Sequence, residues 1–249
     1  MVSQPSGGDV AAVVAPAAQW SNDLLCSYLS VLDELTARIA MLTRPTEASG
    51  HPGLATRSVE GLVDVVDAHL RDSELAIGHG FIAAPEVVDG LERYMLWLQR
   101  DGELIKRLRL NFDTSDLDAY DYVHMDWYTK PARQRGAALT GPYLDYAGAG
   151  RLVITVAAPV FVENRFVGVV GTDLLAEQLE AHITRRLRSV DAEVLLVNDD
   201  RSVVATNSPR WMPGERLHTH PGHDGGNYAA VVALDAWTGW SLAVARPLG

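Results

Sequence analysis

The stretch that decides the fold is Leu152-Val-Ile-Thr-Val-Ala-Ala-Pro-Val-Phe-Val162, which is followed by Phe166-Val-Gly-Val-Val-Gly171. Both runs are apolar and rich in β-branched residues, a composition that is typical of buried strands. A short polar segment about Asn164-Arg165 separates them. Two strands joined by so short a turn must be antiparallel, so the stretch predicts a β-hairpin.

Similar hairpins are expected on both sides of this one. The pairs of predicted strands are residues 94–99 with 104–112, 194–198 with 202–206, and 228–234 with 240–245. The first pair flanks Asp101-Gly102, a dipeptide that tolerates the positive φ angles of a tight turn. The second pair turns at Asp199-Asp200 and the last around Thr238-Gly239.

Three segments carry the spacing of an amphipathic helix instead. They are residues 21–42, residues 57–70 and residues 175–187, whose apolar side chains recur every three or four positions. Ser21 is a plausible N-cap for the first helix, and Pro45 favours its end just before that residue.

The order of these elements predicts an α+β fold, in which N-terminal helices are followed by two antiparallel sheet modules. We expect a mobile tail over residues 1–18, a helical segment over 19–75, a first sheet module over 76–175 and a shorter second one over 176–249. The aromatic-rich segment 113–150 is expected to be a loop that closes over a ligand.

Composition excludes several functions. The 249 residues carry a net charge of −11, which argues against a nucleic-acid-binding face. Cys26 is the only cysteine, so neither a disulfide framework nor a cysteine-based metal site is possible. The sequence has neither an apolar run of membrane-spanning length nor the basic start of a signal peptide, so a cytoplasmic protein without a membrane partner is expected.

Three motifs point to a family. They are Tyr120-Asp-Tyr-Val-His-Met-Asp-Trp-Tyr128, Gly141-Pro-Tyr-Leu-Asp-Tyr146 and Gly168-Val-Val-Gly-Thr-Asp173. In their order and spacing they resemble the ligand-binding module of double Cache domains, the PAS-like sensors of bacterial chemoreceptors and sensor kinases. The resemblance covers residues 20–249 and implies a sensor with two PAS-like sheets.

Amino-acid sensors of that family share a pocket pattern, which can be carried over position by position. The matching residues here are Tyr120, Trp127, Tyr128, Tyr143 and Asp173. The resemblance implies that the aromatic residues and Asp173 hold the ligand's ammonium group. The position of the family's carboxylate-binding arginine is Met125 in this chain.

Methionine cannot replace the planar donor fork with which arginine holds a carboxylate. The ammonium half of the pattern is intact, and Asp126 could add a second anion. We therefore expect a small amine as the ligand, which resembles the amine-sensing variant of the family. The alternative is an amino-acid sensor in which another residue, such as Arg133 or Arg135, supplies the carboxylate clamp.

Each site residue also has a structural explanation. Asp173 could be the N-cap of the following helix, Trp127 and Tyr128 could be core aromatics, and Tyr120 could be an exposed loop residue. Asp126 could face solvent. Asp145, in Pro142-Tyr-Leu-Asp145, is interpreted as a turn residue.

Two further patterns bear on function. His218, His220 and His223 have the residue types of a metal site and would support the rival hypothesis, a metal-assisted enzyme acting on a small polar substrate. Gly78-x-Gly80-x-x-Ala83 imitates a dinucleotide fingerprint, but no strand is predicted before it and Pro85 follows, so that interpretation is rejected.

The sequence therefore predicts a small-molecule sensor and not an enzyme. No cofactor is expected, and a homodimer through the helix of residues 21–42 is a possible assembly. A third hypothesis is an interaction module with a degenerate pocket. The ligand, the downstream regulator and the oligomeric state do not follow from the sequence.

Overall fold

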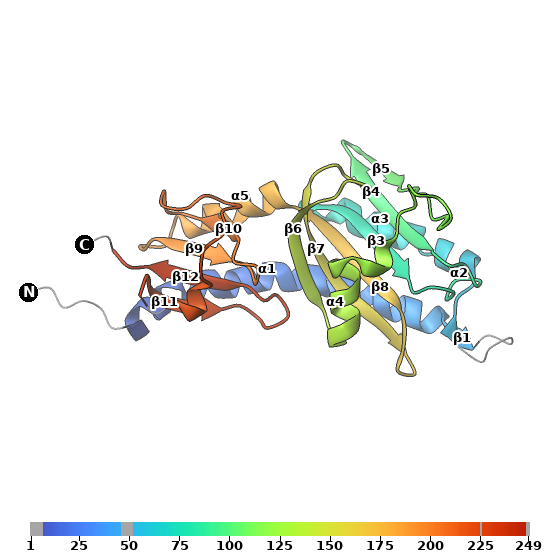
Figure 1. Ribbon diagram of the computed structural model, residues 1–249, viewed down its shortest axis with the longest axis horizontal. Helices are drawn as coiled ribbons and strands as arrows, with labels where there is room; N and C mark the ends of the chain where they lie inside the picture. The colour runs from blue at the N-terminus through green and yellow to red at the C-terminus, as the bar shows by residue number, and fades with distance from the viewer. Residues whose placement is uncertain (1–6, 46–51, 225, 248–249) are drawn as a thin grey trace, which may run out of the picture. The chain divides into compact units, whose positions relative to one another are not determined.

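The computed structural model describes residues 7–45, 52–224 and 226–247. The chain divides into two compact units. The larger unit is Ser27–Leu175, and the smaller unit combines Met1–Cys26 with Ala176–Gly249. Each contains one main antiparallel sheet, as Figure 1 shows. The predicted α+β class with two sheets is confirmed.

The larger unit is built on a six-stranded sheet. In spatial order its strands are β5 (Leu104–Arg107), β4 (Met95–Asp101), β3 (Ala76–Ala83), β8 (Arg165–Leu175), β7 (Leu152–Val162) and β6 (Ala138–Leu144). A separate two-stranded ladder joins β1 (Arg44–Pro45) to β2 (Pro52–Gly53).

The hairpin predicted first lies inside this sheet, between β3 and β6. Strands β7 and β8 pair from Val153↔Leu175 to Val162↔Arg165, around Glu163 and Asn164. Both turn residues have positive φ angles, 50° and 66°, as a tight type I′ turn requires. Strand β8 continues past Gly171, so Asp173 lies within the strand and is not a helix N-cap.

Strand β3 was not predicted, although it lies between β4 and β8. All eight of its residues are buried, so the strand has no polar face to show alternation. Its glycines have steric roles. A Cβ at Gly78 would lie 2.7 Å from the indole nitrogen of Trp97, and a Cβ at Gly80 would collide with the carbonyl of Leu96. The Gly78-x-Gly80-x-x-Ala83 spacing is therefore a packing feature of a strand.

Helices cover both faces of the larger sheet (Figure 1). Helix α3 (Val63–Asp72) packs against β3 and β4, whereas α4 (Asp126–Gln134) lies on the opposite side against β6, β7 and β8. The helix expected over 57–70 is divided into α2 (Thr56–Glu60) and α3. Helix α4 and strand β6 both fall inside segment 113–150, which was expected to be a loop.

Helix α1 (Gly7–Leu42) begins much earlier than expected. The tail predicted over residues 1–18 is helical from Gly7 onward, because its alanine-rich stretch has a high helix propensity despite Pro16. Ser21 is consequently not an N-cap. It is 1% exposed, and its hydroxyl donates to the carbonyl of Ala17 one turn earlier. The predicted end of the helix, before Pro45, is confirmed.

A chain of polar contacts joins α1 to strand β8 inside the larger unit. Glu34 Oε2 lies 3.1 Å from His69 Nε2, and His69 Nδ1 lies 3.4 Å from His79 Nε2. His79 Nδ1 is 2.9 Å from the carbonyl oxygen of Gly171. Since that oxygen can only accept, Nδ1 of His79 carries the proton and Nε2 is left to accept from His69.

The smaller unit contains a four-stranded sheet and helix α5. Its strands, in spatial order, are β10 (Val203–Thr206), β9 (Val194–Val197), β12 (Ser241–Ala245) and β11 (Tyr228–Ala233). Helix α5 (Ala176–Leu187) packs on β10. The two predicted hairpins and the helix between the sheets are confirmed. In the part of the chain that the structure describes, no helix is both long and apolar enough to cross a bilayer.

Burial of His79 predicts a pH dependence of stability. Burial, and next the neighbouring His69, lower the pKa of His79 to about 4. The unfolded state therefore binds a proton between about pH 6.5 and 4 that the folded state rejects, and stability falls as the pH falls through this window. The loss reaches about 3 kcal/mol for a shift of this size.

This contribution can be isolated with His79→Asn, whose amide can still donate to the Gly171 carbonyl. In urea unfolding at pH 7, 6 and 5, the wild-type free energy of unfolding should fall relative to that of the variant. His218→Asn, at an exposed histidine, serves as the control and should follow the wild type. Parallel profiles for the wild type and His79→Asn would contradict the assignment.

Candidate functional site

A cavity of about 30 Å³ lies in the larger unit, between the sheet and the segment that contains α4. Its lining combines aromatic, aliphatic and acidic side chains: Ile82, Met95, Trp97, Leu108, Leu110, Tyr120, Trp127, Tyr143, Asp145, Ala147, Gly148, Thr155, Gly171 and Asp173. Among these residues there is no arginine, lysine or histidine. The cavity thus offers negative charge and π faces.

Asp173 is the acid at the sheet side of this cavity. It lies opposite Thr155 in the β7–β8 ladder, so both side chains point to the same face. The Thr155 hydroxyl donates to Asp173 Oδ1 over 2.6 Å, and the Tyr143 hydroxyl lies 2.7 Å from Thr155 Oγ1. Because the single hydroxyl proton of Thr155 is directed to Asp173, Tyr143 must be the donor in the second bond.

This environment determines the charge of Asp173. The side chain is 7% exposed. Burial, with a further contribution from Asp145, raises its pKa to about 7, although the bond from Thr155 acts in the opposite direction. No residue that the structure describes donates a hydrogen bond to Oδ2. Near neutral pH the carboxyl group is therefore balanced between its two protonation states, and a cation at Oδ2 would favour the ionised one.

Aromatic side chains form the walls of the cavity. Tyr120 and Tyr143 line it together with Trp127 from α4 and Trp97 from β4. Burial, first, and then nearby carboxylates raise the pKa values of both tyrosines, so they remain neutral. Neutral electron-rich rings attract an organic cation, and the attraction grows when water is excluded.

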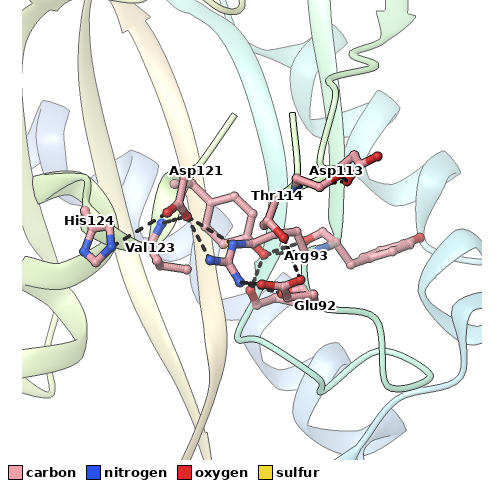
Figure 2. A network of polar contacts seen from close by, with 11 residues as sticks. Glu92, Arg93, Asp113, Thr114, Asp121, Val123 and His124 are labelled. Carbon is pink, nitrogen blue, oxygen red and sulfur yellow. Dashed lines mark hydrogen bonds and ion pairs between the residues drawn. The ribbon is translucent and has the colours of Figure 1, made fainter. Parts of the chain in front are cut away.

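An ion-pair network fixes the segment that brings Tyr120 to the cavity, and Figure 2 shows it. Arg93, two residues before β4, donates two bonds of 3.1 and 3.0 Å to Asp121 Oδ1. The side chain of Arg93 is 10% exposed and that of Asp121 is 40% exposed, so the charge pair is partly shielded from water. Thr114 donates to Glu92 over 2.9 Å, which holds the other end of the segment. Tyr120 is thus fixed next to an anchored residue rather than on an exposed loop.

Asp145 forms the turn that its sequence predicts. Its carboxylate accepts bonds from the backbone nitrogens of Gly148 and Ala149, at 3.1 and 2.6 Å. A Cβ at Gly148 would collide with that carboxylate and approach Gln99 Oε1 to 3.2 Å. The turn also places Asp145 in the cavity lining, which the sequence did not indicate.

The structure brings together Tyr120, Trp127, Tyr143 and Asp173 of the six residues expected at the site. Tyr128 and Asp126 lie outside the lining. Successive residues of a helix point about 100° apart, so Trp127 can face the cavity only if its neighbours in α4 do not.

Tyr128 is a core residue, as its alternative interpretation had it. Its ring packs against those of Trp127, Tyr122 and Phe166, with centroids 6.1, 5.2 and 5.5 Å away. Asp126 is exposed at the start of α4 and does not supply a second anion.

The arginines named as substitute carboxylate clamps also lie elsewhere. Arg135 places its guanidinium 3.9 Å from the ring centroid of Phe161 and donates to Asn164. Neither Arg135 nor Arg133 lines the cavity. Met125, at the position of the family arginine, is 39% exposed and is likewise outside the lining.

The three histidines of the smaller unit do not form a metal site. His218, His220 and His223 border an open hollow together with Asp199 and Arg201. His220 Nδ1 accepts a bond from the backbone of Gly222. Over the described residues, no cluster of three or more potential ligands is arranged to hold a metal ion, and the metal-assisted hypothesis loses its motivation.

Several functional residues were missed by sequence reasoning. Trp97 was placed in a strand without a role, and its position over Gly78 could have been inferred only from the missed strand β3. Thr155 was placed within its strand without a role, because its link between Tyr143 and Asp173 depends on the register of three strands. The sequence did offer one signal for Thr155, because a polar residue within an apolar strand needs a hydrogen-bond partner when it is buried.

The relay from Tyr143 through Thr155 predicts a titration effect. Thr155→Val removes the donor to Asp173 at nearly constant volume, so the pKa of Asp173 should rise above its wild-type value. Thr155→Ser keeps the hydroxyl and is the matched control. NMR titration of the carboxyl carbon measures both, and an unchanged or lower pKa in Thr155→Val would contradict the proposed role of Thr155.

Residues 62–181 match the family model described as methyl-accepting chemotaxis protein-like, first PDC sensor domain. Over 94 residues the chain is 29% identical to the methyl-accepting chemotaxis protein PscA of Pseudomonas syringae pv. tomato. That match covers 34% of this chain and 15% of the relative's length.

Solved structures share the fold over nearly the whole chain. The ligand-binding domain of the Pseudomonas aeruginosa amino-acid chemoreceptor PctC, in complex with GABA, has a TM-score of 0.58 at 15% identity, covering 92% of this chain and 94% of its own. The domain of Pseudomonas fluorescens CtaA, in complex with L-serine, has a TM-score of 0.59 at 16% identity, covering 92% and 91%. The extracellular domain of the putative histidine kinase soHK1S-Z6 has a TM-score of 0.61 at 18% identity, covering 96% and 93%.

The matched parts of these proteins are sensor, ligand-binding or extracellular domains, not catalytic domains. The order of elements in the larger unit and the matched residues 62–181 agree with the resemblance found in the motifs. Residues 62–181 are thus similar to the first PDC sensor domain of methyl-accepting chemotaxis proteins, and every residue that lines the cavity around Asp173 falls within this region.

Proposed function

We propose that the cavity binds a small amine as a signal input, with the ammonium group held at Asp173 Oδ2. The observation that carries this proposal is a buried carboxylate with one unpartnered oxygen in a cavity lined by aromatic rings and by no basic residue. A charged ammonium fits both the carboxylate and the ring faces. The output would be that of a chemoreceptor or sensor kinase.

Gly171 connects the cavity to the rest of the larger unit. It lines the cavity, and its carbonyl accepts from His79, the inner end of the contacts that reach Glu34 on α1. A shift of β8 on ligand binding would therefore be felt at α1. Such a signal requires that the ligand bind the two positions of β8 with different affinities.

An amino-acid ligand is the second candidate. PctC and CtaA were solved with GABA and L-serine, both of which carry a carboxylate beside the amine. Trp127, which the resemblance assigns to the ligand, lines the cavity and could donate from its indole nitrogen. Against an α-amino acid stands the all-acidic charge of the lining, which would repel an α-carboxylate.

A thermal-shift screen with each amine beside its α-amino acid tests the proposal. A ligand at one hundred times its dissociation constant should add about 2.7 kcal/mol of stability. Shifts are expected with amines and not with the paired amino acids. Shifts with amino acids alone would overturn the amine proposal and leave the sensor function standing.

Two aspartates provide a matched pair of variants. Asp173→Asn removes the charge at the cavity and should weaken amine binding by about 10- to 100-fold. Asp126→Asn removes an exposed carboxylate nearby and should leave the affinity unchanged. Equal effects of the two substitutions in calorimetric titrations would contradict a specific role for Asp173.

Amine affinity should also depend on pH. Because the pKa of Asp173 is raised to about 7, protonated Asp173 must release its proton when an ammonium ion binds below that pH. The affinity should then fall by about tenfold for each pH unit below 7. Calorimetry in buffers of different ionisation enthalpy would show the released proton. A flat profile from pH 5 to 7 would mean that Asp173 does not hold the ammonium.

A further inference from the structure

A second hollow, of about 400 Å³, lies beside the cavity in the larger unit. Its lining residues all belong to Ser27–Leu175: Ile77, Gln99, Arg100, Asp101, Gly102, Lys106, Arg107, Leu108, Arg109, Gly148, Ala149, Arg151 and Leu175. Leu108 and Gly148 line both spaces. The two hollows are therefore separated by single residues rather than by a layer of the fold.

The charge of this second hollow is opposite to that of the cavity. Five of its lining residues are cationic, namely Arg100, Lys106, Arg107, Arg109 and Arg151, and Asp101 is the only acidic one. The lining thus has an excess of four positive charges in a chain whose net charge is −11. Such a concentration of one sign in an otherwise acidic protein favours an anionic ligand.

Three of the cations are committed to neighbours within the protein. Arg100 donates to backbone carbonyls of the α3–β3 connection, including that of Ser73. Lys106 pairs with Asp101 at 2.6 Å, and Arg107 pairs with Glu60 at 2.9 Å. Arg109, in contrast, makes neither a hydrogen bond nor an ion pair with any residue that the structure describes. Glu60 interacts with it electrostatically but is already paired with Arg107, so the exposed guanidinium of Arg109 remains available to a ligand.

The acidic and basic hollows lie along one row of the sheet. Lys106 pairs with Gln99, Gln99 with Gly78, and Gly78 with Asp173 across adjacent strands. Neighbouring strands are about 4.8 Å apart, so Gln99 lies roughly 10 Å and Lys106 roughly 14 Å from Asp173 along the backbone. An α-carboxylate, attached to the same carbon as the ammonium, cannot bridge that separation.

The barrier between the hollows is the turn that Asp145 closes. Gly148, whose backbone nitrogen donates to Asp145, lies against Gln99 on its other side. No bulky side chain occupies that position, and a Cβ there would collide with the Asp145 carboxylate. Because that space is filled, a ligand that reaches from one hollow to the other must displace the turn of residues 145–149, which lies outside the strands of the sheet.

We propose that the basic hollow is an anion subsite and that the ligand is a zwitterion with its ammonium at Asp173 and a remote carboxylate or phosphate at Arg109. This inference rests on the amine-binding function proposed for the cavity and specifies its ligand class. Arginine suits the task because its planar fork matches a carboxylate or phosphate with two bonds. Arg151 borders the same hollow from the start of β7.

The test compares n-alkylamines with ω-amino acids and aminoalkyl phosphates of four to eight carbon atoms by isothermal titration calorimetry. In the wild type, the longer zwitterions should bind at least tenfold more tightly than the alkylamines of equal length, and added salt should reduce that difference. The series with the larger gain identifies the anionic group.

Arg109→Gln should abolish the gain while leaving alkylamine affinity unchanged, and Arg151→Gln should reduce it. Arg135→Gln is the matched control, since its guanidinium lies over Phe161 and outside both hollows. Because Arg109 is exposed, its variant should unfold at the wild-type temperature, which excludes misfolding as the cause.

The outcomes separate the two proposals. Equal affinities of alkylamines and zwitterions in the wild type, or a gain that survives in Arg109→Gln, would overturn the anion subsite and leave amine binding intact. Failure of every amine and zwitterion to bind would overturn the proposed function of the cavity itself.

Discussion

The hydrogen bond from Thr155 to Asp173 is the interaction on which the site depends. It joins strands β7 and β8 of the larger sheet on the face that forms the cavity, and it satisfies one oxygen of a carboxyl group that is 7% exposed. Burying an aspartate is costly unless its oxygens find donors, and a single donor leaves the group poised near neutrality. The remaining oxygen can then select a cation from solution.

Small residues make this arrangement sterically possible. Gly78 leaves room for the indole of Trp97, and a Cβ at Gly171 would lie 3.6 Å from the same ring. The sheet therefore carries a large ring on its inner face without losing its pairing. The opposite face is fixed by a buried neutral histidine, His79, whose contacts lead outward to α1. The cavity is thus connected to a helix by a chain of polar contacts through His79 and His69.

Much of the fold could be predicted from local patterns, because the β7–β8 hairpin and the hairpins of the smaller unit alternate between apolar runs and polar turns. Prediction failed for two elements, β3 and the first part of α1, whose sequences do not follow these local patterns. Strand β3 is buried on both faces and contains glycines that a neighbouring ring requires. Helix α1 continues through Pro16, where local rules favour a break.

The candidate site, like the fold, could be predicted only in part from the sequence. The family pattern identified four residues that line the cavity, since they are defined by residue type and spacing. It also included Tyr128 and Asp126. Only the geometry of helix α4 shows that, of the consecutive residues Asp126, Trp127 and Tyr128, Trp127 alone can face the cavity. Four of the five cations of the basic hollow lie within residues 100–109, but only the structure shows that they border one hollow together with Arg151.

The most direct test of this account is a crystal structure of the protein with a bound amine. The account predicts the ammonium nitrogen within about 2.9 Å of Asp173 Oδ2, with Thr155 still bonded to Oδ1 and aromatic rings around the cation. An amine bound elsewhere, or oriented with its nitrogen away from Asp173, would contradict the claim that this buried carboxylate is the ammonium anchor.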